Sequence, residues 1–179
     1  MIDKLYEILL THNRPLTLRE LIFFFIILII VTLMFYILLK KDKIKKFQII
    51  IGELLLLFIF VVLSSTILTR TSNKERMYKL MPFWSWKEVI RGNVKFLEEN
   101  LLNLILLFPF GLLLPFAFYR KISWYKALFV GLVFSFFIEI NQLMLCRGTF
   151  EWDDIIHNSL GAMIGCIVAN KIFERFLKK

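Results

Sequence analysis

Glycine, proline and cysteine are scarce in this chain of 179 residues, which contains 7 glycines, 4 prolines and 2 cysteines. So little glycine and proline excludes collagen-like and low-complexity disordered proteins. Two cysteines cannot form the disulfide framework of a small secreted domain. The sequence also has no CxxC, HExxH or GxSxG motif and no glycine-rich phosphate loop, so the signatures of the common enzyme classes are absent.

Apolar residues, in contrast, make up 59% of the chain, and phenylalanine alone occurs 20 times. A helix needs about 20 apolar residues to cross a bilayer, and four apolar runs approach that length. A fifth run is weaker, because His157, Asn158 and Asn170 interrupt it. Continuous runs favour helices over barrel strands. The sequence therefore predicts an all-α, polytopic membrane helix bundle with about five transmembrane helices, at residues 21–39, 54–68, 101–119, 127–146 and 155–173.

Lysine and arginine are denser in the loops on one side of these spans. The segments at residues 40–46, 120–126 and 171–179 hold 12 Lys and Arg in 23 residues, whereas the opposite side holds 11 in 60. By the positive-inside rule the denser side faces the cytoplasm. We therefore expect the N-terminus outside and the C-terminus in the cytoplasm. The net charge of +9 then reflects topology and contact with anionic lipids, not nucleic-acid binding.

The two cysteines are predicted to be free thiols. Cys146 lies near the outer end of the fourth span and Cys166 lies 11 residues into the fifth. At 1.5 Å per residue their depths differ by about 16 Å, whereas a disulfide allows about 7 Å between Cα atoms.

Glu139 is an ionisable residue inside the fourth predicted span, where a charge is costly and calls for a partner or a function. Ser135 and Gln142 share its helix face at i−4 and i+3, and Arg147 follows just beyond the span. One interpretation is a functional site. The other is a buried glutamate that is protonated, or paired with an arginine, for packing alone.

Two aspartates, Asp153 and Asp154, precede the fifth span. One of them suits the N-cap of that helix, which leaves the other unexplained. Asp154 and Asn158 share a face with a GxxxG pattern that lets another helix approach closely. Although His157 lies nearby, the spacing of the acids and the histidine matches no ligand motif, so we expect no metal and no cofactor. We expect helix packing from three glycines, Gly111, Gly161 and Gly165.

An aromatic segment interrupts the long loop between the second and third spans, with Met81, Pro82, Phe83, Trp84 and Trp86 amid charged residues. Tryptophan is common at bilayer interfaces, so a simple interfacial belt explains the segment. Alternatively, the segment is a re-entrant lid over the polar residues. The sequence leaves both interpretations open.

Four motifs occur in order along the second half of the chain. They are Met81-Pro82-Phe83, then Asn103 followed by Pro109-Phe110-Gly111, then SFFIEINQ at 135–142 with Arg147 after it, and finally DDIIHNSLG at 153–161. Together they resemble the VanZ-like family, small bacterial membrane proteins named after a teicoplanin-resistance protein. The resemblance covers about residues 81–165. The chain departs from the pattern at Leu80-Met81, where the family commonly has Asn-Leu or Asn-Ile.

The resemblance implies a division of the chain and a shared site. Residues 1–46 would form an N-terminal segment with the first helix and a basic cytoplasmic loop, and residues 47–179 a VanZ-like domain. The protein would lie in the bacterial cytoplasmic membrane. Some members would lower susceptibility to lipoglycopeptides such as teicoplanin, by a mechanism that is not established. Matched by motif, the ligand-binding residues would be Asn103, Glu139, Gln142, Arg147, Asp154 and Asn158.

Three functions are compatible with these residues. In the first, an outward-facing polar pocket binds a membrane lipid, a lipid-linked cell-wall precursor or a lipoglycopeptide, with Arg147 holding an anionic group that Gln142 and Asn158 orient. In the second, the protein is an enzyme acting on a lipid head group, with Glu139 as the candidate catalytic acid or base and Asp154 as its partner. In the third, Glu139 and Arg147 pair within a structural or assembly module. Whether the protein is an enzyme, and its oligomeric state, stay open.

Overall fold

The computed structural model describes residues 13–177. Five helices among them are long and apolar enough to cross a membrane, which confirms the predicted membrane helices. These helices are α2 (Leu18–Lys40), α3 (Lys46–Leu63), α5 (Val94–Ala117), α6 (Trp124–Met144) and α7 (Trp152–Leu177). A π-helical segment, η1 (Ser64–Leu68), continues α3. Residues 1–12, the start of the expected N-terminal segment, lie outside the described residues, and the side of the membrane that each loop faces stays a prediction.

All five long helices begin earlier than the apolar runs indicate, and the difference is largest for α3, which starts at Lys46 instead of residue 54. α5 starts at Val94 instead of residue 101, and its first turns carry an i,i+4 ion pair in which Lys95 Nζ lies 3.6 Å from Glu99 Oε1. α7 starts at Trp152, with Asp153 and Asp154 in its first turn, where carboxylates interact favourably with the helix dipole. Hydropathy marks only the apolar part of a helix, so it misses such polar first turns.

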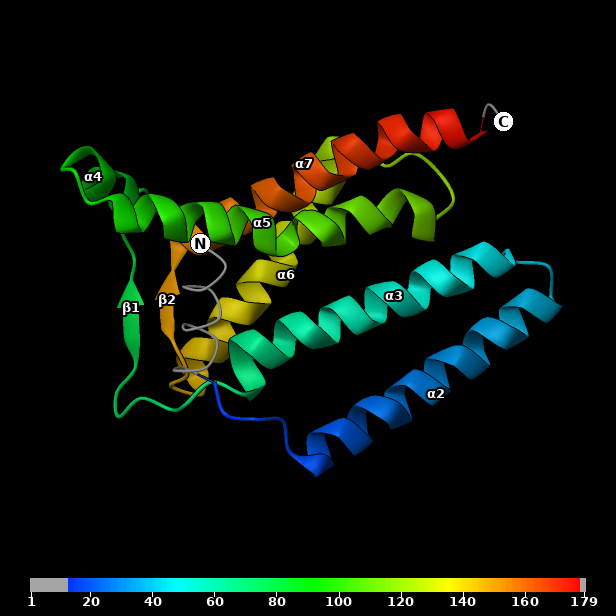
Figure 1. Ribbon diagram of the computed structural model, residues 1–179, viewed down its shortest axis with the longest axis horizontal. Coiled ribbons are helices and arrows are strands. Elements are labelled where there is room, and N and C mark those ends of the chain that lie inside the picture. The colour runs from blue at the N-terminus through cyan, green and yellow to red at the C-terminus, as the bar shows by residue number, and fades with distance from the viewer. Residues whose placement is uncertain (1–12, 178–179) are drawn as a thin grey trace.

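A short helix and a two-stranded ribbon join the loops at one end of the bundle. Helix α4 (Trp84–Ile90) follows strand β1 (Met77–Lys79), which pairs in parallel with β2 (Thr149–Glu151). The register sets Met77 opposite Thr149 and Lys79 opposite Glu151. These elements were not predicted, because three-residue strands and a two-turn helix carry too few residues for a periodic signal. The ribbon leads directly into α7 (Figure 1).

The core of the bundle is the crossing of α5 and α7, with α6 packed against α7 (Figure 1). At the crossing the two backbones touch: a methyl group at Gly161 would lie 1.9 Å from the carbonyl oxygen of Leu104. A methyl group at Gly111 would lie equally close to the carbonyl oxygen of Ala162, and one at Gly165 would lie 2.1 Å from that of Phe108. Only glycine permits this approach, so these positions set the distance between the two helices.

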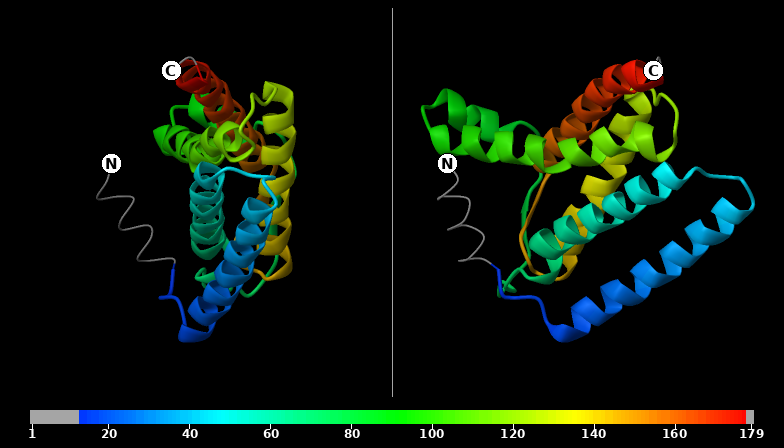
Figure 2. Two further views of the ribbon diagram at one scale, coloured as in Figure 1. Left: turned by 90° about the vertical axis from the view of Figure 1, so that its right-hand side faces the viewer. Right: turned by 45° about the vertical axis from the view of Figure 1, so that its right-hand side comes forward.

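Helices α2 and α3 form a pair beside this core, with α3 between α2 and α5 (Figures 1 and 2). α2 begins with a capping box, in which the backbone N–H of Thr17 donates to Glu20 and that of Glu20 donates to Thr17 Oγ1. The one buried residue of α2 is Phe24, whose ring stacks on Phe60 of α3 at a centroid distance of 4.0 Å. The rest of α2 is exposed or half-buried in the chain, as suits a helix surrounded by lipid.

The end of α6 aims the chain back toward α3. Cys146 adopts the left-handed conformation, at φ 54°, and the N–H of Arg147 donates to the carbonyl of Gln142 at 2.8 Å. This is the hydrogen bond of a Schellman cap, here with cysteine at the position that glycine usually occupies. Cys146 and Cys166 are both free thiols, as expected.

Candidate functional site

Polar side chains gather where α6 ends and α7 begins, inside an otherwise apolar bundle. We call them the polar cluster. Its centre is Glu139 of α6, which is 2% exposed and whose Oε2 accepts a hydrogen bond of 3.0 Å from the N–H of Glu151 in β2. A carboxylate in a spanning helix is thus bonded to the short ribbon beside it. The polar cluster comprises Arg70, Asn103, Ser135, Glu139, Gln142, Asp154 and Asn158.

The floor of the polar cluster lies one helical turn deeper than Glu139. Asn158 of α7 donates from Nδ2 to the hydroxyl of Ser135 in α6 at 2.8 Å, and both residues are fully buried. Ser135 precedes Glu139 by four residues, and Asn158 follows Asp154 by four. The two helices therefore face each other with matching pairs of polar residues, each pair on one side of its helix.

A third helix joins the polar cluster at its rim. Asn103 of α5 donates from Nδ2 to Asp154 Oδ1 at 2.6 Å. Both residues are half-buried, unlike Glu139 and Asn158. The rim of the cluster is therefore more accessible than its floor.

Arg70 is the cation of the polar cluster, and sequence reasoning missed it. Its guanidinium interacts electrostatically with both Glu139 and Asp154. Gly148 makes room for it: a methyl group there would lie 2.7 Å from Arg70 Nη1 and 2.9 Å from Gln142 Oε1. Arg70 follows the second span directly, like many interfacial arginines, so nothing in its sequence position distinguished it.

Arg147, the arginine that the sequence favoured, has a different position. Its Nη1 donates to the backbone carbonyls of Ile67 and Leu68, at 3.0 Å each. These carbonyls end η1, where a cation is favourable. Between these two described residues, Glu139 and Arg147, there is no ion pair. The structure thus gives Arg147 a role in holding α6 to the end of α3.

Gln142 connects the polar cluster to the same segment. Its Nε2 donates to the carbonyl of Thr66 in η1 at 3.0 Å, and its side chain is buried. A π-helical turn leaves carbonyl groups without their usual helical donors. Gln142 and Arg147 both donate to such carbonyls, so η1 and the end of α6 stabilise each other.

Asp153 caps α4 instead of the helix in which it lies. Its carboxylate accepts hydrogen bonds from the N–H of Phe83 and from both the N–H and the hydroxyl of Ser85. These are the first donors of α4, a helix whose own N-cap residue, Phe83, supplies no capping side chain. The prediction that one of the two aspartates is the N-cap of the fifth helix was wrong, because α7 begins at Trp152 and Asp153 caps α4 instead.

The aromatic segment lies beside the polar cluster. Trp86 donates from its indole nitrogen to His157 Nε2 at 2.9 Å, and Trp84 donates to Glu151 Oε2 at 3.0 Å. His157 and Asp153 lie on a face of α7 about 100° from that of Asp154 and Asn158. The segment therefore fastens the start of α7 without lying between Glu139 and Asn158.

Lys79 completes the attachment of the aromatic segment. Its Nζ lies 3.4 Å from Glu151 Oε1 and 3.4 Å from the ring centroid of Trp84. Burial raises the pKa of Glu151, and the charge of Lys79 opposes that shift. The ribbon, α4 and α7 are thus connected by one charged and aromatic group of side chains.

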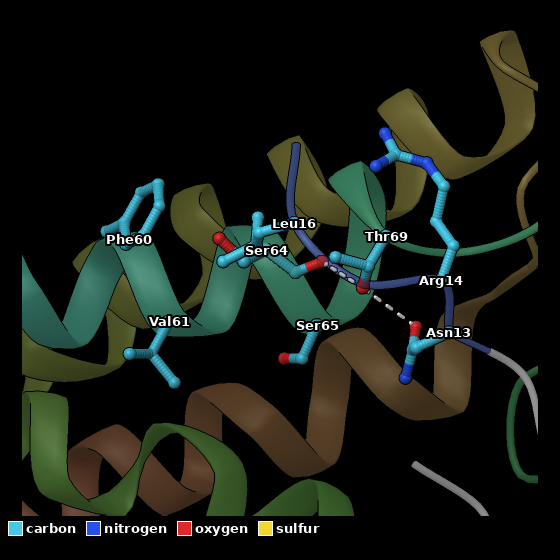
Figure 3. A pocket seen from close by; sticks show the side chains of 8 residues that line it. All are labelled: Asn13, Arg14, Leu16, Phe60, Val61, Ser64, Ser65 and Thr69. Atoms are coloured by element: carbon cyan, nitrogen blue, oxygen red, sulfur yellow. Dashed lines mark hydrogen bonds between the residues drawn. The ribbon is translucent and has the colours of Figure 1, made fainter. Parts of the chain in front are cut away.

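Two cavities of the described residues lie outside the polar cluster. One, of about 320 Å³, lies between the residues before α2 and the end of α3 (Figure 3). Thr69 donates to Asn13 at its edge, at 3.0 Å, and the buried hydroxyl of Ser64 has no hydrogen-bond partner among residues 13–177. The other, of about 530 Å³, lies at the opposite end of the bundle near Trp124 and Asn170. No group of three metal-ligating side chains occurs within residues 13–177.

Of the six ligand-binding residues that the resemblance implied, five lie together in the polar cluster: Asn103, Glu139, Gln142, Asp154 and Asn158. Arg147 lies beside them, turned to η1. The family model for VanZ/LLP1 matches residues 21–174, so the match begins in α2 and covers all five long helices. No curated protein and no solved structure matches the chain. With most of its length covered by that one model, the chain belongs to the VanZ/LLP1 family.

Proposed function

We propose that this protein binds the polar head group of a lipid-linked or lipidated molecule at the polar cluster, and thereby lowers susceptibility to teicoplanin-type lipoglycopeptides in a bacterial cytoplasmic membrane. Glu139 carries the proposal, because it is a carboxylate 2% exposed within a spanning helix. Ionisable residues in such helices are costly and are usually functional. A bundle that needed only packing would be at least as stable with apolar residues there.

The arrangement of the polar cluster supports binding from one end. Its rim, formed by Arg70, Asn103 and Asp154, is half-buried, while Glu139 and Asn158 beneath are covered. On the expected orientation this end faces the outside, where lipid-linked cell-wall precursors and lipoglycopeptides are found. A ligand would meet the rim first and the floor second.

Binding is favoured over catalysis by the composition of the polar cluster. The one hydroxyl in it, that of Ser135, accepts from Asn158, and no histidine or amine in the cluster could activate it as a nucleophile. Glu139 could act as an acid or base with Asp154 as its partner, but no activated nucleophile lies beside them.

Teicoplanin susceptibility tests the proposal directly. A sensitive Gram-positive host would express the wild type, Glu139→Gln or a control, Glu53→Gln, with membrane abundance matched by immunoblot. Glu53 also lies in a spanning helix but bonds to Thr32, away from the polar cluster. We expect protection from the wild type and the control and none from Glu139→Gln. No protection by the wild type would contradict the resistance role, and equal protection by Glu139→Gln would contradict the site.

A further inference from the structure

The polar cluster has more carboxyl groups than cations. Glu139 and Asp154 both interact with the single guanidinium of Arg70. The neighbouring acids have other partners, since Asp153 caps α4 and Glu151 pairs with Lys79. Because these two carboxyl groups share one cation, ionisation of both calls for a second positive group beside them.

The polar cluster also contains a buried acceptor without a donor. Asn158 is 2% exposed, its Nδ2 is used by Ser135, and its Oδ1 has no hydrogen-bond partner in the part of the chain that the structure describes. A buried polar atom left in this way has lost its hydrogen bond to water without gaining another, which is unfavourable. Asn158 lies one turn below Asp154 on the same face of α7, so one bound group could serve both residues.

We propose, on the basis of the function proposed above, that the ligand of the polar cluster presents a primary ammonium group. An ammonium has one positive charge and three N–H donors, which is the second cation that two ionised carboxyl groups call for and which supplies donors for them and for Asn158 Oδ1. The hydrogen bonds of the described residues use Glu139 Oε2 and Asp154 Oδ1, which leaves one oxygen of each carboxyl group without a hydrogen bond within residues 13–177.

This chemistry differs from the anionic group that the sequence suggested for Arg147. That arginine donates to the carbonyls of η1, and Arg70 already faces two acids. An added phosphate or carboxylate would raise the negative charge beside Glu139, whereas an ammonium lowers it. Charge complementarity therefore selects an amine-bearing amphiphile.

A set of three phospholipids with the same acyl chains isolates the ammonium group. The purified full chain in phosphatidylglycerol-free nanodiscs would be offered phosphatidylethanolamine, N-acetyl phosphatidylethanolamine or phosphatidylcholine, and bound lipid would be counted by native mass spectrometry. The first has three N–H donors and a charge, the second has lost the charge, and the third has lost the donors. We expect selective retention of the first, weakened at least about tenfold by Asp154→Asn or Glu139→Gln, because a charge-assisted hydrogen bond is lost.

A second arm identifies the source of the amine. Binding of a lipid with an amino sugar is compared with that of its N-acetylated form and with that of phosphatidylethanolamine, to see which amine binds more tightly. Binding of either amine supports the proposal if it depends on Asp154. Glu53→Gln should bind like the wild type in both arms. Equal retention of all three phospholipids, or amine binding unchanged in Asp154→Asn, would overturn the ammonium assignment. If Glu139→Gln still abolished teicoplanin protection in that case, the proposed function would stand with another ligand.

Discussion

The α5–α6–α7 core and the α2–α3 pair are both membrane helices, yet they are built differently. Half of the most apolar window of α7 is buried inside the chain, compared with 6% of that of α2. α7 meets α5 backbone to backbone at glycines, whereas α2 meets α3 through side chains such as Phe24. The helices at the centre of the bundle are also the less hydrophobic ones. Polar residues are tolerated in the core because other helices, not lipid, surround them.

A comparison of Gly161→Ala with Gly52→Ala tests this contrast, and among our predictions it should show the largest effect on stability. The methyl group at residue 161 would collide with the Leu104 carbonyl, which cannot move without shifting α5. At residue 52 it would meet only the ring of Phe35, 2.6 Å away, which can rotate. We expect a loss of about 3 kcal/mol for the first variant and under about 1 kcal/mol for the second. Unfolding in mixed micelles measures both, and similar losses would contradict the contrast.

Asp153→Ala against Thr17→Ala compares the caps of the two regions. Asp153 accepts from the N-cap residue of α4, Phe83, and from Ser85, and it is 1% exposed, so its removal leaves these N–H groups without an acceptor. Thr17 caps the exposed start of α2, where water replaces it. We expect losses of about 2 and about 1 kcal/mol, respectively. Hydrogen exchange should increase specifically in α4 of Asp153→Ala. Unchanged exchange there would show that the cap is dispensable.

Lys79→Ala should have the smallest effect and a distinct pH dependence. Burial raises the pKa of Glu151, and removal of Lys79 raises it further. An acid whose pKa is higher in the folded protein destabilises the fold when it is ionised. The stability is therefore complete below about pH 4.3, the pKa of glutamate in the unfolded chain, and is lost as the pH rises through the pKa of Glu151 in the folded protein. We expect Lys79→Ala to lower the free energy of unfolding by almost nothing at pH 4 and by about 0.5 kcal/mol at pH 8. The effect is small because Lys79 is partly exposed. A cost that does not depend on pH would contradict the pairing.

The membrane helices were predictable because their signal is long and cumulative. Glu139, Asp154 and Asn158 were also predictable, since a polar residue within an apolar run is conspicuous. Arg70 and Ser85 were not, because their roles depend on contacts with residues about 70 positions away. Arg147 was favoured for its proximity in sequence to Glu139, but the Schellman turn after α6 directs it to η1. Short elements such as β1 and α4 form through the same long-range contacts.

The central claim is that the polar cluster exists for binding and not for packing. Thermal unfolding of purified Glu139→Gln tests this claim most directly. Glutamine keeps the shape and can still accept from the N–H of Glu151. The account predicts an unfolding temperature equal to or above that of the wild type, because a neutral amide can be buried without a compensating cation, together with loss of teicoplanin protection. A fall of about 5 °C or more, which corresponds to roughly 2 kcal/mol for a chain of this size, would show that Glu139 is there for stability and would contradict the account.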